Sequence, residues 1–228
     1  MDPNSLKTTV KQRILIAVIA ILLLGSTFAT YIAIVMSNGK GGGYTKSQLE
    51  EQYTDKQSEI NGYASNLSSK YFVTFSKYLS EVKAYNADAA NSVGVRTRDL
   101  LEGTGRELAT GDLEYYAYYI GFCPDETIFD SSFDDTTNPT ELTAPIYAAQ
   151  GLIEGWNTGV VGMKIGGVRE IQMPGEQAYG ETREICGTTN SPLKFIVMAI
   201  EDEEYKKLYD ELEQIYGELI NQSSSESE

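Results

Sequence analysis

The chain has 228 residues, a formal net charge of −15 and no histidine. This length suits one ordinary domain with extra segments, or at most two small domains. Because the acidic chain has no basic patch, phosphate would be repelled, and we expect no nucleic-acid partner. The lack of histidine excludes Ser-His-Asp and Cys-His catalysis and histidine-containing metal sites. Two cysteines, Cys123 and Cys186, are too few for a four-cysteine zinc site, and we expect no metal or cofactor.

An uncharged apolar segment from Ile14 to Met36 is long enough to cross a hydrocarbon core of about 30 Å. Basic residues are concentrated before it, which predicts cytoplasmic residues 1–13 and an extracytoplasmic remainder. The alternative is a cleaved signal peptide with its cleavage site at Thr27-Phe28-Ala29. We favour an uncleaved single-pass transmembrane helix over residues 14–36, because the apolar sequence continues from Tyr31 to Met36.

A glycine-rich flexible linker, residues 37–44, leads into a polar segment over residues 45–90. Apolar side chains recur there at steps of three, four or seven residues, which predicts one long helical stalk. The stalk could pack on the chain's own domain, or it could form a coiled coil in a homodimer. We favour the first interpretation, because tyrosine is unusual in the seam of a tight coiled coil.

From residue 91 to residue 200 glycines are frequent, and short β-type runs lie between turns. One strand is predicted over residues 113–120, with Leu113, Tyr115, Ala117 and Tyr119 on one face. Further strands are predicted at Val168–Met173 and Lys194–Ile200, with a short helix at Ile153–Met163 between the first and second strands. This is an α+β pattern with room for one core helix.

A C-terminal amphipathic helix is predicted over residues 201–222, before a polar tail at residues 223–228. Its apolar stripe from Leu208 to Leu219 needs a cover, because large exposed apolar patches are rare on monomers. We expect the stripe to pack against the tyrosine-rich face of the stalk from Leu67 to Val82.

Three sequence blocks, Tyr119–Ser132 (YIGFCPDETIFDSS), Gly151–Met163 (GLIEGWNTGVVGM) and Gly166–Gly180 (GGVREIQMPGEQAYG), stand in register. In their order and separation they closely resemble the FKBP-type peptidyl-prolyl isomerases. The resemblance covers about residues 93–199. It implies an FKBP-like bent antiparallel β-sheet wrapped on one short helix, with an apolar active-site pocket between them. Residues 91–200 would form this isomerase domain.

The same resemblance implies a peptidyl-prolyl cis-trans isomerase whose substrates are proline-containing polypeptides. Rotation about a peptide bond breaks no covalent bond, so no nucleophile or metal is required. The implied catalytic residues are Tyr119, Phe129, Asp130, Trp156, Tyr179 and Phe195. The implied substrate-binding residues are Leu152, Ile153 and Ile185. With the predicted topology, we expect an isomerase that assists the folding of exported proteins. The alternative is a non-catalytic chaperone or scaffold, which would not need Trp156, Phe129 and Tyr179 together.

Three features depart from the family pattern, one of which is a stretch at residues 136–150 that is longer than usual by about four residues. No arginine follows Asp130 closely, and the segment between Tyr179 and Phe195 lacks the usual family loop. We therefore expect activity with a different sequence preference and weaker binding of macrolide inhibitors. Cys123 follows the Tyr119-Ile120-Gly121 residues of the first block and Cys186 lies in the altered loop, so both should border the pocket mouth. An exported location would permit a disulfide between them, and two separate thiols are the alternative.

Overall fold

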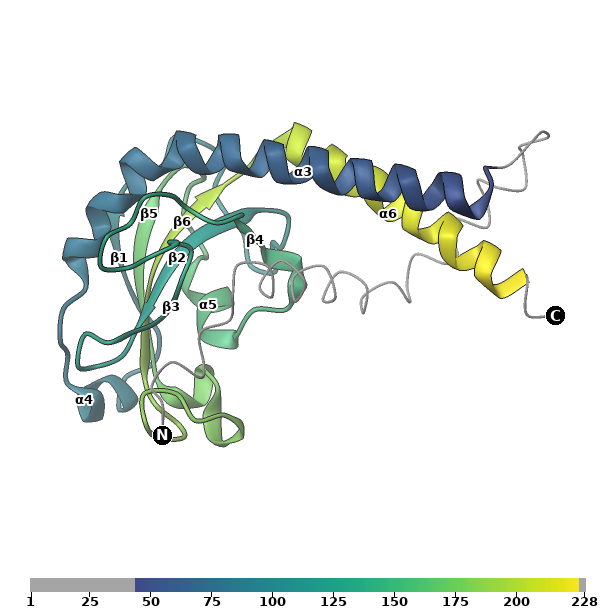
Figure 1. Cartoon of the computed structure of the whole chain (residues 1–228). Coiled ribbons are helices and arrows are strands. Elements are labelled where there is room, and N and C mark those ends of the chain that lie inside the picture. The colour runs from purple at the N-terminus through teal and green to yellow at the C-terminus, as the bar shows by residue number, and fades with distance from the viewer. Residues whose placement is uncertain (1–43, 226–228) are drawn as a thin grey trace. The chain divides into compact units, whose positions relative to one another are not determined.

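The computed structural model describes residues 44–225 of the chain (Figure 1). The predicted transmembrane helix at Ile14–Met36 lies outside these residues, as do segments 1–13 and 37–43. Across the described part, none of the helices combines the length and the apolar character needed to cross a membrane.

A six-stranded sheet forms the centre of the fold. Its strands follow the order β1-β5-β6-β2-β3, β4 also pairs with β2, and every pairing is antiparallel (Figure 1). The strands are β1 (Arg96–Leu101), β2 (Tyr116–Phe122), β3 (Ile128–Ser131), β4 (Ile146–Tyr147), β5 (Val168–Met173) and β6 (Leu193–Ile200). The predicted α+β class and the antiparallel sheet are confirmed.

The predicted strands differ from the observed ones mainly at β2. Strand β5 has the predicted bounds, and β6 begins one residue early, at Leu193. Strand β2 begins at Tyr116, so the start predicted at Leu113 is wrong. Leu113 is 40% exposed, whereas Tyr115 and Ala117 are buried. The alternation of apolar residues therefore identified the correct face of the strand but not its first residue.

One face of the sheet is covered by α5 (Glu154–Gly159), which is shorter than the predicted helix at Ile153–Met163. Two glycines four residues apart allow this helix to lie close to β5. A Cβ on Gly159 would stand 2.3 Å from Cγ2 of Ile171, and a Cβ on Gly155 would stand 2.6 Å from Sδ of Met173. Larger residues at either position would push the helix away from the sheet.

The other face of the sheet is covered by the end of α3 (Lys46–Phe75). Phe75 stacks on Phe133 with ring centroids 5.6 Å apart, and Tyr71 lies 5.9 Å from Tyr118. Ser68 and Tyr118 join their hydroxyls at 3.4 Å within the buried layer. Both faces of the central strands are thus buried, which explains why β2 carries apolar or aromatic side chains on each side.

The continuous helix predicted over residues 45–90 is wrong beyond Phe75. The 3₁₀-helix η1 (Ser76–Glu81) follows, then an extended segment, then the short helix α4 (Ala87–Asn91). Asn86 caps α4 by accepting a hydrogen bond from the Ala89 N–H at 2.7 Å. The hydroxyl of Tyr85 donates to the Pro192 carbonyl at 3.0 Å, which holds the extended segment on the sheet domain. These contacts override the helical spacing of the apolar side chains in this segment.

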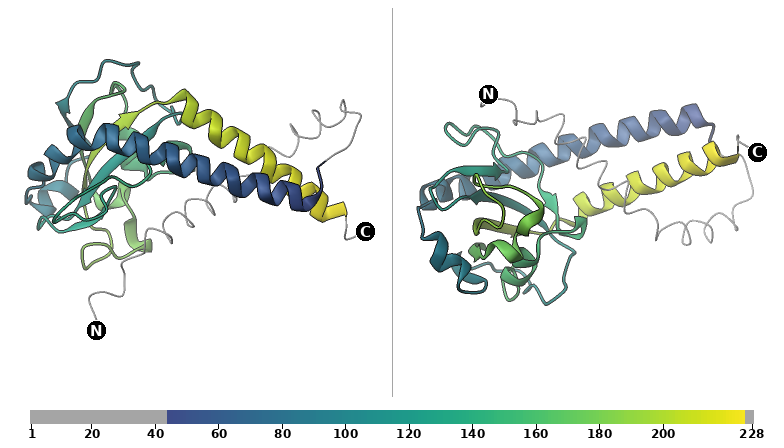
Figure 2. Two further views of the ribbon diagram at one scale, coloured as in Figure 1. Left: turned by 45° about the horizontal axis from the view of Figure 1, so that its top comes forward. Right: turned by 90° about the horizontal axis from the view of Figure 1, so that it is seen from below.

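The first part of α3 and the C-terminal helix α6 (Glu203–Ser225) belong to a separate compact unit. The described residues up to Asn66 and from Asp202 onward form this unit, and Leu67–Glu201 form the other. In Figure 2 α6 runs alongside the first part of α3. Of the buried residues of α3, Leu49 and Ile60 belong to the first unit, and Leu67 and Phe75 belong to the second.

The helices α3 and α6 are antiparallel where they contact each other. Rings of Tyr53 and Tyr216 lie 6.0 Å apart, and the Lys56 ammonium contacts the Glu211 carboxylate at 2.7 Å. The hydroxyl of Tyr63 donates to Asp202 at 2.9 Å. Pairing of the two helices is thus confirmed, but the predicted surface on α3 is wrong. The partner of α6 is the segment around residues 53–63, because the side chains from Leu67 to Phe75 belong to the sheet unit. Pairing of the stalk across a homodimer stays a prediction.

We predict that Leu212→Asp loosens the first part of α3. Leu212 is buried on α6, and its burial contributes roughly 1.5–3 kcal/mol. Hydrogen exchange should show faster exchange of amides 49–63, while β6 keeps its protection. Gln214→Asp is the matched control, because it places the same charge at an exposed position of the same helix. Unchanged exchange of amides 49–63 in Leu212→Asp would contradict the observed pairing.

Candidate active site

The predicted site residues come from five separate segments of the sheet unit and meet in one place. Trp156 and Phe195 belong to the buried core cluster on the α5 side of the sheet. The other apolar site residues are partly buried and pack against that cluster: Tyr119, Phe129, Leu152, Ile153, Tyr179 and Ile185. The structure therefore brings together every apolar residue that the family resemblance implied.

The rings of Tyr119, Phe129, Trp156 and Phe195 form a cluster of four in which most contacts are edge to face. The Phe195 ring centroid lies 5.3 Å from that of Trp156 and 5.7 Å from that of Phe129, with interplanar angles of 70° and 87°. Tyr119 meets Trp156 at 5.8 Å and 80°. These are the separations and orientations that aromatic pairs prefer. Trp156 and Phe195 are buried, whereas the half-buried rings of Tyr119 and Phe129 keep surface that a substrate could contact.

A glycine on β2 makes room for these rings. A Cβ on Gly121 would lie 2.8 Å from Cζ of Phe129 and 2.8 Å from Cε1 of Phe195. Contacts this short do not occur between packed carbon atoms, so any larger residue would displace one of the two rings. Gly121 is therefore needed because it leaves room for the two rings, and not because of its backbone flexibility.

Asp130 is held by partners on its own hairpin. The Tyr119 hydroxyl donates to Oδ2 of Asp130 at 2.7 Å, and the Ser131 backbone N–H donates to Oδ1 at 2.9 Å. A hydrogen bond to a carboxylate is among the stronger kinds in proteins. The interaction fixes the Tyr119 ring and gives Asp130 two donors at a site without a following arginine.

Tyr115 was missed as a site residue by the sequence reasoning. The indole N–H of Trp156 donates to the Tyr115 hydroxyl at 3.0 Å, and both residues are buried. Burial raises the pKa of Tyr115 to about 12, so its hydroxyl stays neutral near neutral pH. The available signal was the period-two spacing of Tyr115, Ala117 and Tyr119, which places Tyr115 on the inner face. That spacing does not reveal that its hydroxyl reaches the indole.

Two further groups lie at the edge of the site. Ile153 stands immediately before α5 with extended backbone, and its N–H has no acceptor among residues 44–225. Tyr179 carries the Arg183 guanidinium over its ring at 5.0 Å. Burial raises the pKa of the Tyr179 hydroxyl above its ordinary value, and the positive charge of Arg183 partly opposes that rise. Both the Ile153 N–H and the Tyr179 hydroxyl can therefore donate hydrogen bonds to a ligand.

In the described part of the chain, no group of three or more acidic or cysteine side chains is placed to hold a metal ion.

The chain is similar in sequence to known proteins. The family model described as FKBP-type peptidyl-prolyl cis-trans isomerase matches residues 105–200. An FK506-binding protein of Neisseria meningitidis serogroup B is 39% identical over 87 residues, which cover 38% of this chain and 75% of the relative. A probable FK506-binding protein of Corynebacterium glutamicum is 38% identical over 101 residues, covering 43% of this chain and 79% of the relative. A crystal structure of AtFKBP13 aligns with 49% of this chain and 97% of its own, at 28% identity and a TM-score of 0.37.

The antiparallel sheet, the short helix α5 against one of its faces and the aromatic cluster define a small isomerase domain of one known type. On the sequence relationships, this chain belongs to the FKBP-type peptidyl-prolyl cis-trans isomerase family.

We predict that Tyr115→Phe weakens the support of Trp156. The variant leaves the buried indole N–H without its acceptor, which costs about 1–3 kcal/mol. Thermal unfolding should therefore occur at lower temperature. Trp156 is the only tryptophan, so its fluorescence should also report a changed environment in the folded variant.

Tyr147→Phe serves as the control, because Tyr147 lies on β4 and its ring packs on Tyr116 rather than on Trp156. If Tyr115→Phe shifts neither the melting temperature nor the emission spectrum, the hydrogen bond does not hold the indole.

Proposed function

We propose that this chain isomerises X-Pro bonds in exported polypeptides, while the apolar segment Ile14–Met36 tethers it to the membrane. The edge-to-face ring cluster beside the Tyr119–Asp130 hydrogen bond is the observation that carries the catalytic part of the proposal. Rotation about a peptide bond meets a barrier of about 18–20 kcal/mol. Uncatalysed cis-trans isomerisation of an X-Pro bond takes tens to hundreds of seconds. A site lowers this barrier if it binds the twisted amide more tightly than the planar one.

Apolar surroundings favour the twisted amide. At the transition state the C–N bond loses its double-bond character. Polar solvent stabilises the planar, resonance-stabilised amide more than the twisted one, so an apolar site removes that advantage. The proline ring would pack on the half-buried faces of Tyr119 and Phe129, with Trp156 and Phe195 beneath as the base of the site. Burial of the substrate there removes water from the rotating bond.

Fixed hydrogen-bond donors would select one orientation of the substrate. The Ile153 N–H would hold a substrate carbonyl, and the Tyr179 hydroxyl would donate to the carbonyl that rotates. Leu152 and Ile185 would contact neighbouring apolar side chains. Asp130 would act through Tyr119, whose ring it orients. Preorganised donors of this kind stabilise a transition state without reorganising during the reaction.

Export is supported by two observations. Basic residues are concentrated before the apolar segment, which is typical of a cytoplasmic N-terminus. The described part of the chain contains a disulfide between Cys123 and Cys186, and disulfides are typical of oxidising compartments outside the cytoplasm. The substrates would then be proline-containing polypeptides that fold after translocation, with no nucleic acid involved.

We predict that Phe129→Ala lowers kcat/KM for an X-Pro peptide by at least about tenfold, or about 1.4 kcal/mol of barrier. The variant removes the half-buried ring that packs on Phe195 and leaves the Tyr119–Asp130 bond in place. Phe72→Ala is the matched control, because Phe72 packs on Phe133 at 6.2 Å on the opposite face of the sheet. Equal kcat/KM values for the two folded variants would exclude Phe129 from the active site.

We also predict that kcat/KM stays constant between about pH 7 and about pH 9.5. The Tyr179 hydroxyl donates only while protonated, and burial raises its pKa above the ordinary value of about 10. Its contribution is therefore fully present below pH 10 and is lost only as the pH rises through the raised pKa. Tyr179→Phe should lower kcat/KM over the whole range without changing the shape of the profile. A wild-type profile that declines near pH 8, and flattens in Tyr179→Phe, would show that the phenol titrates much earlier.

A further inference from the structure

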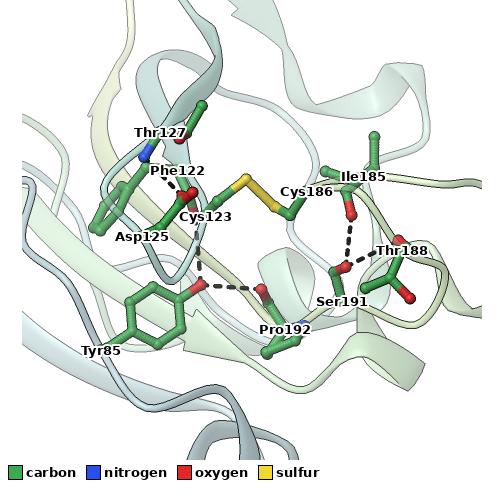
Figure 3. The surroundings of a disulfide bond; sticks show 10 residues. All are labelled: Tyr85, Phe122, Cys123, Asp125, Thr127, Ile185, Cys186, Thr188, Ser191 and Pro192. Atoms are coloured by element: carbon green, nitrogen blue, oxygen red, sulfur yellow. Dashed lines mark hydrogen bonds between the residues drawn. A yellow bond between two sulfur atoms is a disulfide. The ribbon is translucent and has the colours of Figure 1, made fainter.

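Cys123 and Cys186 form a disulfide in the structure, which settles the question that the sequence left open (Figure 3). Their Cα atoms lie 5.7 Å apart, and 63 residues separate them in the sequence. Cys123 is buried at the end of β2, and Cys186 is partly buried in the loop that follows Tyr179. The bond therefore joins two segments that both lead to the candidate active site.

The Cys123 side of the bond supports the hairpin that carries Phe129 and Asp130. The Cys123 N–H donates to the Thr127 carbonyl at 2.8 Å, which closes the turn before β3. Strand β3 starts at Ile128, so only a few bonds separate the closed turn from the two site residues. A fixed position for Cys123 thus fixes the start of β3.

The Cys186 side carries Ile185, which packs against the core cluster. Ile185 and Thr188 exchange backbone hydrogen bonds at 3.1 and 3.3 Å, closing a turn with Cys186 and Gly187 at its centre. Both central residues have positive φ, 59° and 78°. This turn geometry strongly favours glycine or asparagine, and a cysteine at such a position is uncommon. The cysteine at this position is explained by the cross-link that it forms.

Most other hydrogen bonds of the loop that follows Tyr179 are formed within the loop. Figure 3 shows the Ser191 hydroxyl bridging the carbonyls of Ile185 and Thr188, at 2.6 and 2.9 Å. Asn190 donates its N–H to the Gly180 carbonyl at 2.7 Å. These contacts give the loop a defined internal shape. They do not reach the β2–β3 turn. The disulfide is the covalent connection to it, and the Tyr85 hydroxyl adds a weaker link between the carbonyls of Phe122 and Pro192, at 3.4 and 3.0 Å.

We propose that the Cys123–Cys186 disulfide positions Ile185 against the aromatic site and so strengthens the binding of apolar X-Pro segments. The inference rests on the proposed isomerase function and adds two positioning residues to it. Ile185 is the contact that the substrate would meet, and the cysteines act through it. Hydrogen bonds within the loop join Ile185 to the residues on either side of Cys186, so the cross-link restrains Ile185 without touching the substrate.

The bond also makes substrate binding dependent on redox state. A dithiol reductant would transfer two electrons and two protons to the bond, leaving two protein thiols and a disulfide in the reductant. The loop would keep its internal hydrogen bonds and the Tyr85 contact at Pro192, but Cys186 would lose its covalent link to the β2–β3 turn. Because Trp156 and Phe195 belong to the core, we expect the ring cluster to survive reduction.

The test measures KM and kcat for an X-Pro peptide with the full-length chain in detergent micelles, oxidised and after treatment with dithiothreitol. We expect reduction to raise KM by about threefold or more while kcat stays within about twofold. The variant Cys123→Ser with Cys186→Ser should match the reduced protein. Circular dichroism and Trp156 fluorescence confirm that each form is folded.

A thermodynamic cycle with Ile185→Ala separates positioning from general stabilisation. The oxidised variant should show a raised KM, and reduction should change it little further, because the contact that the bond positions is already gone. Ile215→Ala is the control, since Ile215 lies on α6 in the unit that does not contain the site, and its KM should respond to reduction as the wild type does.

The outcomes distinguish this inference from the proposed function. An oxidised wild type without isomerase activity would overturn the function itself. An active wild type whose KM is unchanged by reduction, or equal KM responses in wild type and Ile185→Ala, would overturn only the positioning role. Loss of the fold on reduction would do the same, because the bond would then serve folding alone.

Discussion

The pairing of β2 with β6 is the constraint on which the site depends. In this ladder Gly121 stands opposite Phe195, and Tyr119 stands opposite Val197. Successive side chains on a strand alternate between faces, so this register places Tyr119 and Phe195 on the α5 side together. A slip of one residue would turn Phe195 to the other face and break the ring cluster. Because Gly121 has no side chain, Phe129 from the neighbouring strand can reach the same space.

The ring cluster also explains how a chain without histidine can contain an active site. Each ring packs against its neighbours, and two of the four rings also make a hydrogen bond. The Trp156 indole N–H donates to the Tyr115 hydroxyl, and the Tyr119 hydroxyl donates to Asp130. These two hydrogen bonds restrict rotation of the Trp156 and Tyr119 rings. The Tyr115 hydroxyl stays protonated near neutral pH, because burial raises its pKa to about 12. Bond rotation needs shape and desolvation rather than proton transfer, and a rigid apolar surface with a few fixed donors can provide both.

The sequence predicted the fold and most of the site because both are encoded by local patterns. Alternation located β5 and the inner face of β2, and the three motif blocks located Phe129, Asp130 and Trp156. Contacts between distant segments were not predictable in this way. The end of α3 at Phe75 depends on Tyr85 reaching Pro192, more than one hundred residues later. The Tyr115–Trp156 bond and the surface of α3 that meets α6 likewise depend on how elements are placed in space.

The central claim is that the ring cluster accelerates rotation of the X-Pro bond, rather than only holding the peptide. Exchange NMR on a proline peptide with a substoichiometric amount of the full-length chain tests it most directly. The account predicts exchange between cis and trans signals on a timescale far shorter than the uncatalysed tens to hundreds of seconds. Shifted peptide signals that show binding, with cis-trans exchange as slow as in the free peptide, would contradict it and indicate a non-catalytic chaperone.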